Sequence, residues 1–296
     1  GCLRTAQAEI HGIGGTALKG QIITLHANEY FAESGGELYR LSARGRMKGR
    51  TDILVGDFVE FENGAISRVY ERISQFIRPS VANVEQIVAV LSSEPKPDFL
   101  MLDKLLVSAE KEGVPVVLAV NKNDLGADVY EKVRREYAGA GTEIMSVSAA
   151  RGDNLSALRE KIRGRLTALA GQSAVGKSSL VNAMFSTDLR VGALSGIKRG
   201  RHTTTSSRIY TFGDCRIVDT PGFAVLETDV LAEDLAAYYP EFEKSAGLCR
   251  FRGCTHTSEP GCEVKRLAEN GGIDRERYLR YAELFRRLKE KRREYE

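Results

Sequence analysis

The segment Gly171–Ser178 has the spacing G-x-x-x-x-G-K-S, which is typical of a phosphate-binding loop. In such a loop the backbone amides wrap the β-phosphate, Lys177 can bridge the β- and γ-phosphates, and the Ser178 hydroxyl can hold Mg²⁺. A glycine-rich turn that binds nothing is disfavoured, because a predicted strand precedes the segment and a predicted helix follows it. We expect Lys177 to act in catalysis. The expected nucleotide contacts here are Gly171, Gln172, Ser173, Ala174, Val175, Gly176, Lys177, Ser178 and Ser179.

Two segments earlier in the chain can read the base of a nucleotide. In Asn121-Lys122-Asn123-Asp124, the Asp124 carboxylate can accept from guanine N1–H and from the 2-amino group, which adenine lacks. Asn121 would steady the other edge of the base and the neighbouring loops. Ser148-Ala149 follows a predicted strand, so the Ala149 amide can donate to guanine O6. GTP is therefore favoured over ATP, with expected base contacts at Asn121, Lys122, Asp124, Ser148 and Ala149.

Two later segments can sense the γ-phosphate. Asp219, in Asp219-Thr220-Pro221-Gly222, can reach Mg²⁺ through water, and the Gly222 amide can contact the γ-phosphate. Thr204 is predicted to join Mg²⁺ to the γ-phosphate, with the adjacent Thr203 and Thr205 as alternatives. These contacts exist with GTP and vanish after hydrolysis, so the two segments are expected to order and release as switches.

The residue after Gly222 departs from the usual pattern. Many GTPases place a glutamine there to orient the attacking water, whereas this chain has Phe223, which cannot do so. His202, beside the threonines, is the candidate for that role, although it could instead only form a hydrogen bond within a mobile loop. Slow hydrolysis is expected until a partner arranges the site.

Three cysteines and one histidine lie close together near the C-terminus. Cys₃His is a common set for structural zinc, and four protein ligands leave no position for a catalytic water. The alternative is three incidental cysteines. The predicted ligands of one Zn²⁺ per chain are Cys249, Cys254, His256 and Cys262.

The elements that would position these residues fall into two patterns. Short strands separated by hairpin turns predict a small OB-like barrel, for which an SH3-like barrel is the alternative; they are Gln21–Leu25, Glu37–Leu41, Asp57–Phe61 and Ala65–Val69. Apolar strands alternating with helices then predict a doubly wound, mostly parallel sheet. Its strands are Gln86–Leu91, Pro115–Val120, Glu143–Ser146, Leu166–Ala170, Ser207–Thr211 and Cys215–Val218, and its helices are Phe99–Lys111, Val129–Tyr137, Leu155–Arg163 and Lys177–Phe185.

Composition sets broader bounds. A chain of 296 residues predicts two or three domains, and its net charge of +3 says little, because nucleic-acid affinity depends on where charge lies. Clustered cations at Arg44, Arg46, Lys48 and Arg50 could contact RNA phosphates, whereas the basic run 275–293 could equally be a solvated helix face. We expect no membrane span and no secretory signal, a reducing cytoplasmic setting, and a monomer.

The base-reading segments precede the phosphate-binding loop, the reverse of the usual GTPase order, which predicts circular permutation. The whole set resembles the bacterial small-subunit-dependent GTPases of the RsgA (YjeQ) family. The resemblance is carried by Gly56-Asp57, Arg78-Pro79, Ala82-Asn83, Asn121–Asp124, Gly171–Ser178, Gly200–Thr205, Asp219–Gly222, and Cys249, Cys254, His256 and Cys262.

The resemblance implies three domains: an OB-fold RNA-binding domain (residues 1–78), a circularly permuted GTPase domain (79–230) and a C-terminal helical domain that binds zinc (231–296). It implies a GTPase that binds the small (30S) ribosomal subunit and its 16S rRNA late in maturation. Hydrolysis of GTP to GDP and phosphate would be stimulated by that subunit. It also implies that His202 takes the place of the missing glutamine.

Two other functions fit the residues less well. A nucleotide-gated RNA-binding module, whose turnover is incidental, remains open because Phe223 replaces the glutamine. A small-molecule kinase could use the same phosphate-binding loop, but Asp124 and the Asp219–Gly222 switch argue against it.

Overall fold

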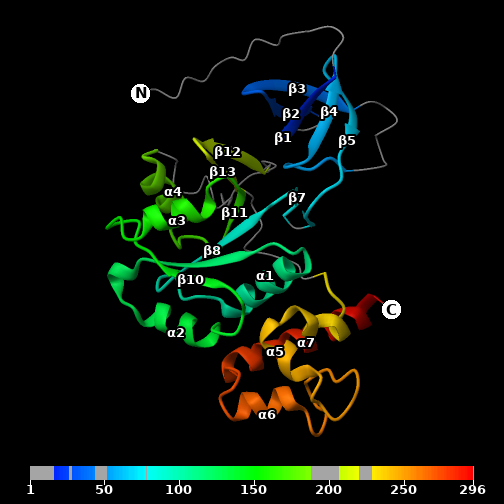
Figure 1. Cartoon of the computed structure of the whole chain (residues 1–296), viewed down its shortest axis with the longest axis vertical. Helices are drawn as coiled ribbons and strands as arrows, with labels where there is room; N and C mark the ends of the chain where they lie inside the picture. Colours follow the sequence, from blue (N-terminus) through cyan, green and yellow to red (C-terminus); the bar gives the residue numbers. More distant parts are fainter. Residues whose placement is uncertain are drawn as a thin grey trace.

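The computed structural model describes residues 17–26, 29–43, 52–77, 79–187, 207–219 and 229–295. Three parts follow one another along the longest axis (Figure 1): a β-barrel, a central α/β domain and a helical C-terminal part. No helix among the described residues is both long and apolar enough to cross a membrane. Several residues singled out in the sequence lie outside the described ranges, namely Arg44, Arg46, Lys48, Arg50, Arg78, His202, Thr203, Thr204, Thr205, Gly222 and Phe223.

The N-terminal part is a five-stranded barrel of the expected OB type. Its strands follow the order β1-β2-β3-β5-β4, and a β1–β4 pairing closes the ring. Two-residue turns, Gly35-Gly36 and Asn63-Gly64, have positive φ at both positions, as tight hairpins with right-handed strand twist require. The strands are β1 (Leu18–His26), β2 (Glu29–Ser34), β3 (Glu37–Ala43), β4 (Phe58–Glu62) and β5 (Ala65–Val69).

Strand β2 was not among the predicted strands. Its sequence gathers Tyr30, Phe31 and Ala32 in one run between polar residues, so it lacks the apolar–polar alternation that predicts a strand. The barrel core gathers around Ile22, Val59, Phe61 and Ile66.

A buried ion pair fastens the barrel to the linker that leaves it. Asp57 is fully buried and accepts two hydrogen bonds from the Arg72 guanidinium, at 2.7 and 2.8 Å, and one from the Leu54 amide. The preceding Gly56 has φ +96°, and a Cβ there would lie 1.9 Å from the Ala82 carbonyl oxygen. Only glycine therefore permits this approach.

The central domain is the expected doubly wound sheet. Five parallel strands run in the order β10-β9-β8-β11-β13, and β12 pairs antiparallel with β13. Helices α1 and α2 cover one face, and α3 and α4 cover the other. The elements are β8 (Gln86–Ser92), α1 (Phe99–Lys111), β9 (Val116–Asn121), α2 (Asp128–Glu136), β10 (Glu143–Ser146), α3 (Leu155–Ile162), β11 (Leu166–Ala170), α4 (Lys177–Phe185), β12 (Arg208–Phe212) and β13 (Cys215–Asp219).

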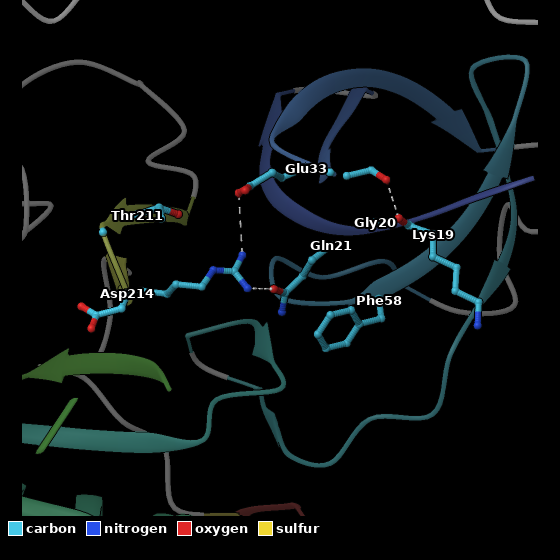
Figure 2. A pocket seen from close by; sticks show the side chains of 11 residues that line it. Lys19, Gly20, Gln21, Glu33, Phe58, Thr211 and Asp214 are labelled. Atoms are coloured by element: carbon cyan, nitrogen blue, oxygen red, sulfur yellow. Dashed lines mark hydrogen bonds and ion pairs between the residues drawn. The ribbon is translucent and has the colours of Figure 1, made fainter. Parts of the chain in front are cut away.

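The barrel and the central domain share one sheet, which the sequence pattern did not indicate. Strand β12 pairs antiparallel with barrel strand β1, with Arg208 opposite Thr24, and this pairing makes a continuous sheet of eleven strands. Figure 2 views this junction, with the barrel on one side and the β12–β13 hairpin on the other. A further two-stranded sheet, β6 (Gln75–Phe76) with β7 (Val81–Ala82), lies in the linker.

The C-terminal part packs on α1 through a core of its own. Val107 of α1 joins that core together with Leu235, Phe242 and Tyr281. The elements of this part are η2 (Ala232–Tyr238), α5 (Pro240–Ala246), α6 (Glu263–Glu269) and α7 (Arg275–Tyr295).

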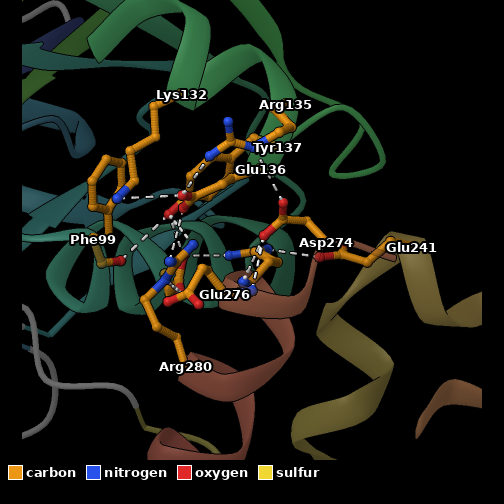
Figure 3. Close-up of polar contacts among 11 residues, drawn as sticks. Phe99, Lys132, Arg135, Glu136, Tyr137, Glu241, Asp274, Glu276 and Arg280 are labelled. Atoms are coloured by element: carbon orange, nitrogen blue, oxygen red, sulfur yellow. Dashed lines mark hydrogen bonds and ion pairs between the residues drawn. The ribbon is translucent and has the colours of Figure 1, made fainter. Parts of the chain in front are cut away.

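Buried charges fasten helix α7 to α1 and α2 (Figure 3). Arg277, 1% exposed, pairs with Asp103 of α1 and with Glu241. Arg280 pairs with the other oxygen of Asp103 at 2.7 Å and with Glu136 of α2 at 2.8 Å. The basic run is thus not simply a solvated face, because two of its arginines hold the C-terminal part against the central domain.

Candidate nucleotide site and metal centre

The predicted nucleotide residues that fall within the described ranges lie at the carboxyl edge of the parallel sheet. Asn121 ends β9, Gly171 follows β11, Asp219 ends β13, and Ser148-Ala149 comes shortly after β10. Ligands in open α/β sheets bind at this edge, where the strand order reverses. The sheet therefore brings together segments that the chain separates by about a hundred residues.

Two glycines of the phosphate-binding loop are sterically required. A Cβ on Gly171 (φ +135°) would lie 2.2 Å from the Val90 carbonyl oxygen. A Cβ on Gly176 (φ +98°) would lie 2.3 Å from Nδ2 of Asn121. Gly176 caps α4, whose first-turn amides have no intrahelical acceptor and so are available to an anion.

Lys177 is the buried cation of this loop. Its Nζ donates to the carbonyl oxygens of Gly171 and Gln172, both at 2.8 Å. Burial lowers the pKa of Lys177 to about 8, against an opposing effect of Asp219, and burial raises the pKa of Asp219 to about 7. The protein thus supplies Lys177 with little compensating charge. A polyphosphate would supply the missing negative charge.

Asn121 ties the phosphate-binding loop to the base-reading loops. It is 2% exposed, its Nδ2 donates to the Val175 carbonyl at 2.9 Å, and its Oδ1 accepts from the Ala149 amide at 3.1 Å. These hydrogen bonds join the phosphate-binding loop to the loop that follows β10. The Ala149 amide, expected to meet guanine O6, here donates to Asn121, so O6 would have to share or replace this bond.

Asp124 is oriented by Ser148. The fully buried Ser148 donates from Oγ to Asp124 Oδ1 at 2.5 Å, and this hydrogen bond is the main reason why the pKa of Asp124 is lowered. A lowered pKa keeps the carboxylate ionised, as an acceptor for two guanine donors must be. Lys122, with φ +62°, donates from Nζ to the carbonyls of Ala174 and Glu94, at 2.9 and 2.6 Å.

Sequence reasoning missed Asp98. Its side chain caps α1 by accepting from the Met101 amide at 2.9 Å, and its own amide donates to Gln172 Oε1 at 3.0 Å. An aspartate directly before a predicted helix is a recognisable N-cap signal. Its bond to the phosphate-binding loop depends on the tertiary fold.

Helix α1 also contacts the chain directly after residues 220–228. Lys111, its last residue, donates to the Asp229 carbonyl at 2.5 Å and lies 3.4 Å from the Asp229 carboxylate. Helix α1 thus makes three contacts. The N-terminal end of α1 contacts the phosphate-binding loop, its C-terminal end contacts the chain after residues 220–228, and its middle contacts α7.

The four predicted zinc ligands lie close together in space. The ligand atoms of Cys249, Cys254, His256 and Cys262 all lie within 4.8 Å of one another. His256 Nδ1 is 3.5 Å from Cys249 Sγ and 3.4 Å from Cys262 Sγ, and those two sulfurs are 3.9 Å apart. Zn–S bonds of about 2.3 Å in a tetrahedron imply sulfur separations of about 3.8 Å, so the arrangement fits a four-coordinate ion.

Surrounding groups hold these ligands in place. The amides of Glu263 and Lys265 donate to Cys249 Sγ and Cys262 Sγ, at 3.3 and 3.5 Å. From α7, the Tyr278 hydroxyl donates to the His256 carbonyl at 2.9 Å. Such outer contacts orient metal ligands, so α7 serves both the metal centre and the interface with α1.

Comparison with known proteins agrees with this geometry. The family model described as RsgA GTPase matches residues 69–229. A protein of Ruminiclostridium cellulolyticum, named small ribosomal subunit biogenesis GTPase RsgA, is 40% identical over 77% of this chain and 76% of its own length. A protein of the same name from Shouchella clausii is 36% identical over 94% of this chain and 99% of its own.

Two solved structures share the fold. YjeQ from Thermotoga maritima superposes with a TM-score of 0.79 at 35% identity, covering 92% of this chain and 99% of that protein. YloQ, described as a circularly permuted GTPase, gives a TM-score of 0.76 at 29% identity, covering 96% and 99%. The predicted permuted fold is thereby confirmed, and a GTP-hydrolysing family excludes the kinase alternative. This chain belongs to the RsgA GTPase family.

Proposed function

We propose that this protein is a GTPase that binds the small (30S) ribosomal subunit late in its maturation and is stimulated by it to hydrolyse GTP to GDP and phosphate. The observation that carries the proposal is one set of hydrogen bonds. Asn121 joins the phosphate-binding loop to the base-reading loops, in a chain whose relatives are named small ribosomal subunit biogenesis GTPases.

The proposed roles of Lys177 and Asp124 are supported by their side-chain contacts, and those of the remaining residues by the sequence pattern. Lys177 would leave the loop carbonyls and bridge the β- and γ-phosphates, and Asp124, held by Ser148, would read guanine. Mg²⁺, when bound with GTP, neutralises phosphate charge. Ser178 and Thr204 would hold it, and Asp219 would reach it through water. His202 would orient the attacking water in place of the missing glutamine.

The Cys₃His cluster would hold one structural Zn²⁺. Three thiolates and an imidazole at these separations leave no coordination position for water, so the ion would shape the fold rather than catalyse. Zinc would then brace the loop between α5 and α6, and α7 would tie that loop to α1.

Ribosomal RNA would be the partner of the barrel. Arg44, Arg46, Lys48 and Arg50, which lie between β3 and β4 in the sequence, would contact phosphates, so binding to the subunit should weaken with salt. Reversing these charges should lower subunit affinity and leave GTP affinity intact.

The test is steady-state GTP hydrolysis by the full-length protein, alone, with small subunits, and with large subunits as the control. Stimulation by small subunits only would support the proposal, and His202→Ala should abolish that stimulation without loss of GTP binding. No stimulation by either subunit would contradict it.

A second candidate is a nucleotide-gated RNA-binding module, which Phe223 in place of glutamine favours. It would bind small subunits in a GTP-dependent manner without accelerated turnover. Single-turnover hydrolysis with the subunit present distinguishes the two, since only the first candidate shows a faster chemical step.

A further inference from the structure

A pocket of about 450 Å³ opens where the barrel meets the β12–β13 hairpin, away from the nucleotide site. Figure 2 shows Gln21 and Phe58 on the barrel side, with Thr211 and Asp214 on the hairpin side. The volume lies in the range of about 300–1,000 Å³ that is usual for small-ligand sites. The mixed lining of an aromatic ring, cations and carboxylates indicates a polar ligand that also has an apolar face.

The inner wall of this pocket is pre-formed. Gln21 is 4% exposed and donates from Nε2 to the Gly56 carbonyl at 2.8 Å. Its Oε1 accepts from Arg216, whose guanidinium also lies 4.0 Å from the Glu33 carboxylate. Arg216 is on β13, the strand that ends at Asp219, so one arginine joins the pocket to the GTPase domain.

The outer wall carries a half-exposed aromatic ring. Phe58 is 46% exposed, whereas its strand neighbours Val59 and Phe61 are buried in the barrel core. Lys19 lines the same pocket, and its Nζ lies 5.1 Å from the centroid of the Tyr70 ring. Exposed rings beside cations on a barrel form platforms on which unpaired bases stack.

We propose that this pocket takes one unpaired nucleotide of single-stranded RNA. The base stacks on Phe58, the Arg216 guanidinium lies at its edge, and Lys19 pairs with a backbone phosphate. Double-stranded RNA cannot use the ring, because both faces of each of its bases are already stacked. The inference rests on the proposed function only in taking RNA as the partner.

A nucleotide bound in this pocket would connect the barrel to the GTPase domain. The nucleotide would contact barrel strands β1 and β4 together with β13, so binding would hold the barrel against the GTPase domain. That contact adds to the short β1–β12 pairing, for which one residue pair, Thr24 with Arg208, is in register.

The test is fluorescence anisotropy of the full-length, zinc-loaded protein with a fluorescein-labelled ten-nucleotide single-stranded RNA of mixed sequence. Phe58→Ala should raise the dissociation constant about tenfold, in line with the loss of one base–aromatic stack. Phe58→Trp should restore binding. Lys19→Ala should reduce the slope of log K against log salt by about one.

Matched controls are Leu38→Ala, an exposed apolar residue on β3, and Lys161→Ala, a cation on α3; each should stay within twofold of wild type. Unchanged affinity of Phe58→Ala, or no RNA binding at all, would overturn the proposal. Equal competition by free nucleoside monophosphates would overturn the RNA assignment in favour of a mononucleotide pocket. Because this assay contains no ribosomal subunit, its failure is separable from failure of subunit-stimulated hydrolysis.

Discussion

Replacing Asp103 with asparagine should loosen helix α7 from the central domain. Asp103 is fully buried and accepts from Arg277, from Arg280 at 2.7 Å, and from the Tyr137 hydroxyl at 2.6 Å. The substitution keeps the shape of the side chain and removes its charge. Two arginines then remain near Glu136 and Glu241 alone, and Arg277, whose side chain is 1% exposed, cannot recover water without moving.

The size of the effect follows from this burial. Removing one partner of a buried ion pair costs about 3–5 kcal/mol, because the remaining charge stays uncompensated. The bonds to Asp103 share one carboxylate, so their individual contributions of about 1.5–3 kcal/mol do not add. We therefore expect the free energy of local opening at this interface to fall by about 3–5 kcal/mol.

Hydrogen exchange of the α7 amides measures this opening directly, and it avoids the single unfolding free energy that a chain of several domains does not have. Exchange should accelerate by roughly a hundredfold to several thousandfold. The control is Arg286→Ala, which removes exposed pairs with Glu283 and Glu290 on the same helix and should cost below about 1 kcal/mol. If Asp103→Asn cost no more than Arg286→Ala, the buried network would not be what holds the interface.

Three further predictions concern the ligands. Because burial lowers the pKa of Lys177 to about 8, the amine is charged below that pH and neutral above it. Equilibrium titration should therefore show GTP affinity falling as the pH rises through 8, with Lys177→Arg removing this fall. Asp124→Asn should weaken GTP binding and improve XTP binding, measured by competition, since an amide can donate to the 2-oxo group of xanthine; a parallel loss of both would contradict a base-reading role. Atomic absorption should find one zinc per chain and none in Cys254→Ser, and zinc retained in this variant would argue against the ligand set. A chelator should speed amide hydrogen exchange in α6 while GTP binding persists.

Local sequence pattern was sufficient to predict most helices and strands of the central domain. The bounds of α1, β10, β11 and α4 match the predicted ranges, because apolar periodicity and flanking turn residues lie within each segment. The phosphate-binding loop and the Cys₃His set were recognisable for a related reason. Their chemistry demands particular residues at short, fixed spacing, so each motif can be recognised in the sequence without knowledge of the fold.

Other features depended on contacts between distant residues. Strand β2 was missed because Tyr30, Phe31 and Ala32 form one short run between polar residues rather than alternating with them. The β1–β12 pairing joins backbone groups, which carry no side-chain signal. Likewise, nothing local distinguishes the buried Arg277 from exposed arginines of the same helix.

The amino-acid sequence by itself determined which chemical groups this protein has, the order in which they occur, and hence the family of GTPases to which it belongs. The tertiary structure decided which of those groups meet. Asn121 and Val175, which are 54 positions apart, bond because parallel strands bring their carboxyl ends to one edge. Asp103 and Arg277, which are 174 positions apart, pair because two helices bury their charges together. Spacing along a chain can specify a motif, but burial and pairing across such distances depend on how the whole chain packs.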